Sequence, residues 1–211
     1  MYSVINCAQG HSIDVVSLDA PDATFVKDFP LKVHALGPGW LKYRYTGQIV
    51  PWLKAHAAEY DALIVNGIWQ YHSFAVWRAL HRTSTPYFVF THGMLDPWFR
   101  FTYRLKHIKK WMYWPWAEYR VLRDARAVLF TCEEERLLAR QSFWLYKCNE
   151  VVVSFGTAGT MGDAAAQRHA FLERFPELRG KRVWLFLSRI HLKKGCDLLI
   201  DAFVRRIQVP G

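Results

Sequence analysis

The sequence predicts an α/β fold in which a parallel sheet is covered by helices on both faces. Three observations lead to this prediction. Short runs of β-branched and aromatic residues alternate with segments of helical periodicity along the chain. Several of these runs are continuously apolar, as strands buried on both faces of a parallel sheet are. The 211 residues, 52% of them hydrophobic, are enough to bury a full core.

Seven runs are expected to form strands, because their lengths and their β-branched or aromatic content are typical of strands. In chain order they are SIDVVSL (12–18), LKVHAL (31–36), YDALIVNG (60–67), PYFVFTHG (86–93), RAVLFTC (126–132), EVVVSF (150–155) and RVWLFLS (182–188). Because helical segments separate most of these strands, the sheet is expected to be parallel.

Six segments have the apolar spacing of helices. In chain order they are 47–59, 72–82, 103–124, 132–143, 164–175 and 195–206. Thr131 is followed three residues later by Glu134, which predicts a capping box for the helix that begins at Cys132. Pro115 lies inside the segment 103–124 and predicts a kink or a new helix start there.

Three loops that follow predicted strands carry polar side chains. They are NGIW (66–69), THGMLDP (91–97) and TCEE (131–134). In open parallel sheets, ligands bind just beyond the carboxyl ends of the strands. These three loops are therefore the places where the sequence predicts a functional site.

The net charge of +10 is concentrated in one segment. From Arg100 to Arg126 there are eight Lys or Arg residues against two acids, Glu118 and Asp124. An apolar stripe at helical spacing runs through the same segment and consists of Ile108, Trp111, Met112, Trp116, Tyr119 and Leu122. Two interpretations remain open. The stripe packs on the sheet with its cations in solvent, or the segment 100–126 lies on an anionic membrane surface.

Cysteine usage and hydropathy indicate the cellular compartment. Cys7, Cys132, Cys148 and Cys196 are far apart and form no CxxC pair, so free thiols are expected rather than a zinc site or a disulfide framework. No apolar run approaches the length of a bilayer span, and the first residues lack the pattern of a signal peptide. The sequence therefore favours a cytoplasmic location.

Four segments in a fixed order resemble one enzyme family. They are VNGIWQYHSFAVWRAL, PYFVFTHGMLDPWF, KHIKKWMYWPWAEYRVLRDARAVLFTCEEERLLA and LSRIHLKKGCDLLIDAF. In this order and at these spacings, from about Gly10 to Phe203, the chain resembles a bacterial family-4-type retaining glycosyltransferase of the GT-B fold. The resemblance implies two Rossmann-like domains that face each other across a cleft. The first would hold the acceptor and the second the nucleotide-sugar donor.

The resemblance also implies the reaction and its partners. A UDP- or GDP-linked sugar would be the donor, and a saccharide or a lipid-linked sugar in cell-surface polysaccharide synthesis would be the acceptor. The nucleotide-sugar would be a substrate, and neither a cofactor nor a metal ion is expected. The protein would be cytoplasmic and peripheral on the inner face of the plasma membrane, and no nucleic acid is expected to bind.

The domain boundaries follow from the resemblance. Residues 1–155 would form the acceptor-side domain without its first strand, 156–181 a linker, and 182–211 one strand and one helix that begin the donor domain. Neither the glycine-rich loop of the family's start nor the paired glutamates of its donor domain is found. The chain is therefore expected to be truncated at both ends, poorly soluble and inactive by itself.

Two cations of the last segment match a family motif. Arg189 and Lys194 occupy the arginine and lysine positions of the GRxxxxKG pattern, here SRIHLKKG with Ser188 in place of the first glycine. The resemblance implies that both bind the donor diphosphate, since fixed cations stabilise the charge of a leaving diphosphate. The alternative is a solvated basic loop in front of a helix.

The acceptor-side candidates lie in the three polar loops. His92 matches the family histidine near the transferred sugar, where an imidazole can hydrogen-bond a sugar hydroxyl. The alternative is a histidine packed in a tight turn. Asn66, Trp69 and Glu134 are further candidates, although Asn66 also suits a turn and Glu134 the capping box.

A function of a different class is also considered. The basic, aromatic segment could belong to a non-catalytic module that binds an anionic membrane surface or nucleic acid. The aromatic residues follow an apolar helical period, and no RNA-binding motif is found. Steep salt dependence of nucleic-acid binding would distinguish this module from the enzyme.

Overall fold

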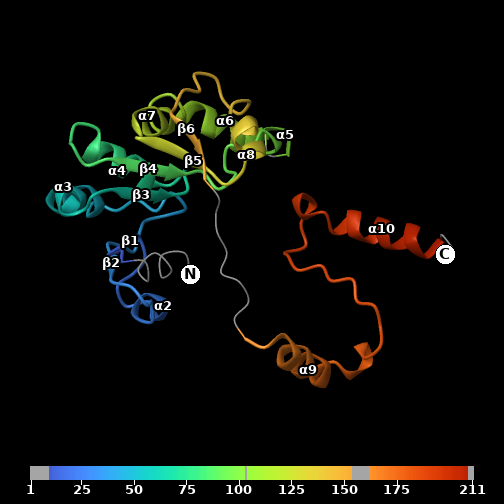
Figure 1. Ribbon diagram of the computed structural model, residues 1–211. Coiled ribbons are helices and arrows are strands. Elements are labelled where there is room, and N and C mark those ends of the chain that lie inside the picture. Colours follow the sequence, from blue (N-terminus) through green and yellow to red (C-terminus); the bar gives the residue numbers. More distant parts are fainter. Residues whose placement is uncertain (1–9, 103, 154–161, 209–211) are drawn as a thin grey trace. The chain divides into compact units, whose positions relative to one another are not determined.

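The computed structural model describes residues 10–102, 104–153 and 162–208, which form two compact units, Met1–Ala158 and Gly159–Gly211 (Figure 1). Some sequence predictions lie outside the described residues. They concern Cys7, the start of the segment 103–124, the end of the strand 150–155 and the first part of the linker 156–181.

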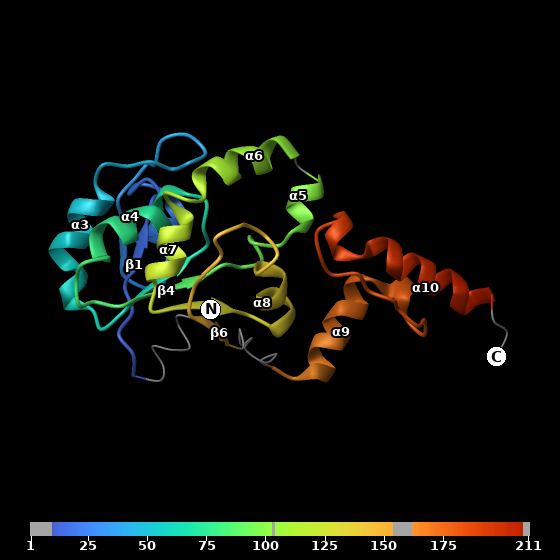
Figure 2. The same ribbon diagram turned by 90° about the horizontal axis from the view of Figure 1, so that it is seen from above.

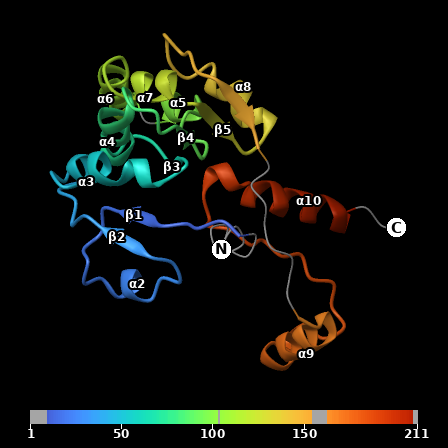
Figure 3. The same ribbon diagram turned by 60° about the vertical axis from the view of Figure 1, so that its left-hand side comes forward.

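The first unit contains two sheets whose strands are all parallel. A two-stranded sheet pairs β1 with β2, and a four-stranded sheet has the order β3-β4-β5-β6 (Figure 3). The strands are β1 (Val15–Ser17), β2 (Val33–Ala35), β3 (Leu63–Asn66), β4 (Tyr87–Phe90), β5 (Ala127–Phe130) and β6 (Glu150–Val152). The prediction of an α/β fold with parallel strands is confirmed, and each of these strands lies within a predicted run.

Helices flank these sheets. They are α2 (Thr24–Lys27), α3 (Ile49–His56), which continues into the 3₁₀ turn η1 (Ala57–Glu59), α4 (Tyr71–Leu80), α5 (Trp98–Thr102), α6 (Arg104–Tyr113), α7 (Glu118–Asp124) and α8 (Glu133–Ala139). In the view of Figure 2, α3, α4 and α7 lie next to one another, in agreement with their packing contacts. The short helices α2 and α5 are not predicted by the sequence.

The predicted helix 103–124 is divided in two. It separates into α6 and α7, and the break from Trp114 to Ala117 contains Pro115. Proline has no N–H for the helical hydrogen-bond ladder and clashes with the preceding turn. The predicted kink or helix start at Pro115 is therefore confirmed.

The core lies between the four-stranded sheet and these helices. Val65, Val89 and Val128 form one row across β3, β4 and β5, and each is buried. The same core contains Ala75 of α4 and Val121 of α7, which are both fully buried. Full burial of a valine side chain stabilises the folded state by about 1.5–3 kcal/mol.

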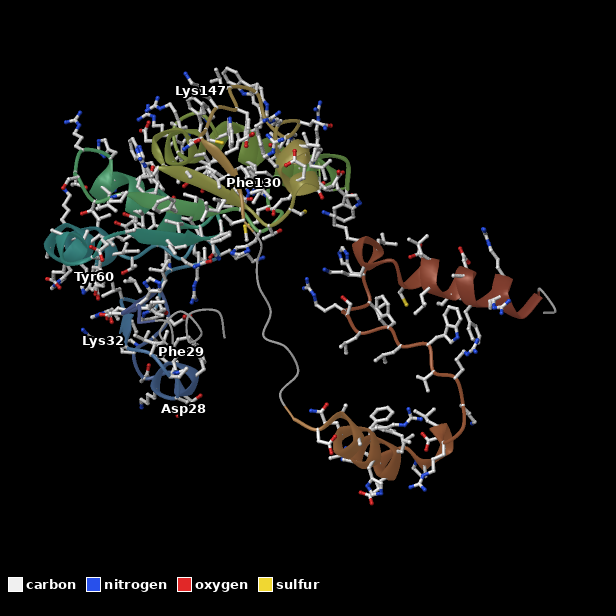
Figure 4. All side chains as sticks on the ribbon, viewed as in Figure 1. Asp28, Phe29, Lys32, Tyr60, Phe130 and Lys147 are labelled. Carbon is white, nitrogen blue, oxygen red and sulfur yellow. The ribbon has the colours of Figure 1, made fainter. Side chains whose placement is uncertain are left out.

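The two-stranded sheet is tied to the rest of the unit by Asp14. Its carboxylate accepts hydrogen bonds from Tyr60, just after η1, at 2.8 Å and from His34 of β2 at 2.9 Å (Tyr60 is labelled in Figure 4). Lys32 lies 3.2 Å from the same oxygen. The hydrogen bonds from His34 and Tyr60 are the main reasons that the pKa of Asp14 falls to about 2.

The second unit contains helices but no strand among its described residues. Its helices are α9 (Ala164–Arg174) and α10 (Cys196–Gln208), with 3₁₀ turns η2 (Pro176–Leu178) and η3 (Leu192–Lys194). The predicted helices 164–175 and 195–206 are confirmed, and α9 lies within the segment predicted as a linker.

The predicted strand 182–188 is wrong. These residues pair with no other strand in the described part of the chain, and Leu185 and Leu187 are exposed. A β-strand needs a neighbour to satisfy its backbone groups. Because the described residues of this unit offer no such neighbour, the apolar run alone does not produce a strand. Its Trp184 ring makes an edge contact with Phe203 of α10, with the ring centroids 5.8 Å apart.

Candidate functional site

The carboxyl ends of β3, β4 and β5 meet at one edge of the sheet. Asn66 is the last residue of β3, His92 follows β4, and Thr131 follows β5. A pocket of about 340 Å³ opens at this edge. It is lined by His92, Gly93, Leu95, Asp96, Thr131, Cys132, Glu134, Glu135 and Leu138, and we call it the edge pocket.

Asn66 and His92 are brought together by the fold. The amide Oδ1 of Asn66 lies 3.1 Å from the Nε2 of His92, within hydrogen-bond distance. The imidazole also stacks on Phe90, with the ring centroids 5.5 Å apart. Two neighbouring strands therefore fix the position of the His92 ring at the rim of the edge pocket.

His92 is held in a tight turn. Its φ is +48° and that of Gly93 is +70°, and the Met94 N–H donates to the Thr91 carbonyl at 3.0 Å. Positive φ at both central positions is the pattern of a type I′ turn, and histidine is one of the residues that tolerates it best. The alternative interpretation, a turn, thus describes the backbone correctly, and the same turn directs the imidazole to the pocket.

Glu135 connects the ends of β4 and β5. Its Oε1 accepts hydrogen bonds from the Thr91 hydroxyl at 2.7 Å and the Gly93 N–H at 2.6 Å. Its Oε2 accepts from the N–H and the hydroxyl of Thr131 at 2.8 and 2.7 Å. Burial alone would raise the pKa of this carboxyl, but the hydrogen bonds from Thr131, Thr91 and Gly93 together lower it below its usual value. Glu135 therefore stays ionised and braces the His92 turn.

The predicted capping box of Thr131 and Glu134 is wrong. Cys132 is the N-cap of α8 and makes no side-chain cap hydrogen bond, whereas Thr131 pairs with Glu135. The side chain four residues after Thr131 reaches back to it because Cys132 is extended, with φ of −156°. Glu134 is exposed and lines the edge pocket. Three successive glutamates, 133–135, follow Cys132 in the sequence. The one that binds Thr131 is Glu135, four residues later, and not Glu134 as predicted.

Trp69 lies beside a different cavity. This second cavity has a volume of about 450 Å³ and is lined by Tyr43, Trp69, Lys109, Lys110, Tyr113 and Trp116; we call it the aromatic pocket. Trp69 has a φ of +75°, a conformation that costs a non-glycine residue of order 1 kcal/mol or more. Its indole Nε1 donates to the Met94 carbonyl at 3.2 Å, which links it to the loop after β4.

Glu118 binds the backbone of Trp69, and the sequence did not predict it as a site residue. It is fully buried, and its Oε1 accepts from the Trp69 N–H at 2.8 Å and from the Ser73 hydroxyl at 2.9 Å. Within the described part of the chain, its Oε2 has no hydrogen-bond partner. Burial raises the pKa of Glu118 to about 7. The sequence signal for this residue is weak: Glu118 is an acid between the apolar Ala117 and Tyr119 in an otherwise basic segment.

Arg189 and Lys194 belong to the second unit. Arg189 precedes the turn η3, which ends at Lys194, and both side chains are exposed. The His191 Nδ1 accepts from the Lys193 N–H at 3.2 Å, and Gly195, with φ of +67°, leads into α10. Arg189 therefore precedes one short turn in front of α10, and Lys194 ends that turn.

Two other kinds of site are not found in the described residues. No group of three or more His, Cys, Asp or Glu side chains there could hold a metal ion. None of the described helices combines the length and the apolar content that crossing a bilayer requires. Cys132, Cys148 and Cys196 are free thiols.

Parallel strands flanked by helices define a Rossmann-like α/β domain, and the edge pocket lies at the sheet edge where ligands bind in such folds. The family model described as "Glycosyl transferase 4-like domain" matches residues 7–156, most of the chain. The chain therefore belongs to this glycosyltransferase family, and the resemblance to family-4-type enzymes is confirmed at this level. No curated protein and no solved structure matches the chain significantly.

Family membership favours the enzyme over the non-catalytic module. The domain implies a sugar donor and a sugar acceptor as substrates. The matched residues include the edge pocket and the aromatic pocket, and they end before the unit that carries Arg189 and Lys194.

Proposed function

We propose that this protein is a cytoplasmic, retaining glycosyltransferase that takes a sugar from a UDP- or GDP-linked donor. The acceptor is a saccharide or a lipid-linked sugar of cell-surface polysaccharide synthesis. The observation that supports this most is the edge pocket, where Asn66 holds the His92 imidazole 3.1 Å away at the end of the sheet. The pocket lies within the family-matched residues.

The edge pocket supplies groups suited to a sugar. The imidazole of His92 can donate to or accept from a sugar hydroxyl, and the contact with Asn66 helps to orient the ring. Glu134 on the rim can accept a hydrogen bond from a second hydroxyl. Glu135 is fully engaged with the two strand ends and acts as a positioning residue for the His92 turn.

On the donor side, the proposal assigns charge stabilisation to Arg189 and Lys194. When the bond from the anomeric carbon to the diphosphate breaks, both electrons stay with the diphosphate oxygen, and two fixed cations stabilise the resulting charge. The acceptor oxygen forms the new bond to the anomeric carbon, and its hydroxyl proton passes to the departing diphosphate. The reaction needs no metal ion in this scheme. The segment 182–188 before Arg189 has no strand partner among the residues that the structure describes, so no sheet there supports the two cations. We therefore expect the 211-residue chain alone to turn over very slowly or not at all.

We also assign α6 to the surface of an anionic membrane. Leu105, Ile108 and Met112 lie on one side of α6 and are 80%, 54% and 60% exposed. Trp111 of the same helix packs against Trp144, with the ring centroids 5.7 Å apart, and the two residues are 50% and 49% exposed. By contrast, Leu122 of α7 is buried. Exposed aromatic and aliphatic side chains next to lysines are typical of a helix that lies in the headgroup region.

The test of the proposed function uses the 211-residue chain with candidate acceptor saccharides and UDP- or GDP-sugars. Saccharide binding, measured by calorimetry, should weaken about tenfold in His92→Ala, because a lost hydrogen bond to a sugar hydroxyl is worth roughly 1 kcal/mol or more. Lys147→Ala, an exposed residue outside both pockets, is the control.

Nucleotide release is measured in the same samples. We expect none above background. Saturable release that depends on Lys194 would contradict the expected inactivity of the chain, and binding that is indifferent to His92 would contradict the assignment of the edge pocket.

A further inference from the structure

The aromatic pocket has no role in the scheme above. Four of its six lining residues are aromatic, namely Tyr43, Trp69, Tyr113 and Trp116. Its volume of about 450 Å³ falls within the range of small-molecule sites, which are mostly apolar with a few placed polar groups. The ring of Tyr113 meets the ring of Trp116 edge to face at 4.7 Å, and its hydroxyl hydrogen-bonds that of Tyr43. The walls of the pocket are therefore aromatic rings that hold one another in place.

The backbone holds Trp69 in an unfavourable conformation. Its positive φ persists because the buried Glu118 accepts its N–H and the Met94 carbonyl accepts its indole N–H. Its ring centroid also lies 5.2 Å from that of Phe143. Backbone strain that the surrounding structure enforces is concentrated at ligand sites. The fold thus fixes the Trp69 ring as one wall of this pocket.

Positive charge lies at the same pocket. Lys109 and Lys110 of α6 both line it, and the Lys110 Nζ is 4.5 Å from the centroid of the Trp69 ring. Lysine ammonium groups attract carboxylates and phosphates. The pocket therefore combines flat apolar walls with two cations, a combination that neither a neutral apolar ligand nor a simple inorganic anion would use fully.

We propose that the aromatic pocket binds a sugar ring that carries a negative charge. The C–H face of the ring packs against Trp69 or Trp116, and its carboxylate or phosphate faces Lys109 and Lys110. This inference rests on the proposed function, because it makes the ligand an anionic sugar unit of the acceptor. The aromatic rings give the ring its orientation, and the lysines select the charged sugar over the neutral one.

The experiment measures binding to the 211-residue chain by calorimetry and ligand-observed NMR. Four probes are compared: a disaccharide containing glucuronate, the matching disaccharide containing glucose, glucose 1-phosphate, and inorganic phosphate. We expect each anionic sugar to bind at least about tenfold more tightly than the neutral one, because it gains a charge-assisted hydrogen bond. The anionic sugar that binds more tightly shows whether the site prefers a carboxylate or a phosphate.

Two pairs of variants make the assignment specific. Trp116→Ala is matched by Trp144→Ala, because the two rings are 48% and 49% exposed and only Trp116 lines the pocket. Lys109→Gln is matched by Lys147→Gln, since both lysines are exposed. Binding of the anionic sugar should fall about tenfold in each pocket variant and stay unchanged in each control.

Three results would overturn the inference. Equal affinity for the neutral and anionic disaccharides would remove the role of the lysines, and an unaffected Trp116→Ala variant would remove the aromatic wall. Inorganic phosphate that binds as tightly as glucose 1-phosphate would also reduce the site to an anion site. The two proposals are separated by the ligand that each variant affects. His92→Ala should weaken binding of neutral acceptor saccharides and keep the preference for the anionic sugar over the neutral one, whereas Trp116→Ala and Lys109→Gln should reduce that preference.

Discussion

At the scale of single residues, a glutamate stabilises the backbone beside each pocket, and the pKa values of the two glutamates are shifted in opposite directions. Glu118 is buried with one oxygen lacking a partner among the described residues, and its pKa is raised to about 7. Glu135 accepts four hydrogen bonds from the ends of β4 and β5, and its pKa is lowered. The two carboxyls should therefore affect stability in opposite directions as the pH changes.

The first prediction concerns Glu118→Gln. Between pH 4.5 and about 7 the folded chain keeps a proton on Glu118 that the unfolded chain has lost, so the stability of the native state falls as the pH rises through this window. The loss from this group is on the order of 3 kcal/mol. Glu118→Gln cannot titrate and should show a flatter pH profile of the free energy of unfolding, measured by denaturant titration. An unchanged profile in the variant would contradict the buried, protonated state.

The second prediction concerns Glu135→Gln. The wild-type contribution of this group is present above the unfolded pKa and is lost as the pH falls through the lowered folded pKa. An amide at this position places two N–H donors where backbone and hydroxyl donors already point. We expect a loss of about 2 kcal/mol or more at neutral pH.

Glu134→Gln is the matched control for Glu135→Gln, because the neighbouring glutamate is exposed. A surface change of this kind should alter the unfolding free energy by less than about 0.5 kcal/mol. Identical denaturation midpoints for the two variants would show that Glu135 does not brace the strand ends.

The residues of the site could be predicted only in part. The positions of Asn66 and His92 after buried strands placed both at one sheet edge, and the structure brings them within 3.1 Å. The choice between Glu134 and Glu135 depends on the extended backbone of Cys132, which the sequence pattern does not reveal. The cavity beside Trp69 depends on its positive φ and on packing between distant segments, for which local patterns give no signal.

At the scale of elements, α6 and α7 show how one apolar stripe can serve two environments. Pro115 lies at the break between the two helices, and the stripe residues of the two helices differ in how far they are buried. Leu122 of α7 joins the core, whereas Ile108 and Met112 of α6 are exposed. The sequence left both interpretations of the stripe open. Packing in the core is confirmed for Leu122 of α7, whereas the α6 half is exposed and its contact with a membrane stays a proposal. The stripe's regular period could not reveal this division, because the period is the same on both sides of the break.

The third prediction follows from the exposed side of α6. The protein should bind vesicles that contain about one third anionic lipid, and binding should weaken as salt screens the lysines. Ile108→Asp combined with Met112→Asp should abolish co-sedimentation with these vesicles, because each change places a charge on the face that enters the headgroup region.

Phe25→Asp is the control for these two variants, since Phe25 of α2 is also exposed and lies on a different helix. Co-sedimentation of the Ile108→Asp, Met112→Asp chain at the wild-type level would show that α6 is not the membrane-binding element.

At the scale of the whole molecule, the two units differ in how far the sequence could describe them. The first unit has neighbouring strands for each predicted run, so local pattern and final structure agree. In the second unit α9 and α10 form as predicted, because a helix satisfies its own backbone groups. The strand 182–188 does not form, because a strand depends on partners that its own sequence cannot supply. Arg189 and Lys194 consequently follow a segment without the support of a sheet.

We propose that the first unit is the acceptor-side part of a glycosyltransferase and that His92 acts at the transferred sugar. The most direct measurement joins residues 1–158 to the donor domain of a characterised family-4-type enzyme and follows transfer from a radiolabelled nucleotide-sugar to saccharide and lipid-linked acceptors. Circular dichroism and nucleotide binding first establish that the chimera and its His92→Ala variant are folded and hold the donor equally. We expect sugar transfer in the chimera and a loss of about a hundredfold or more in His92→Ala, within the usual range for a group that acts on the reacting sugar. Equal transfer by the two chimeras would show that His92 has no role at the transferred sugar.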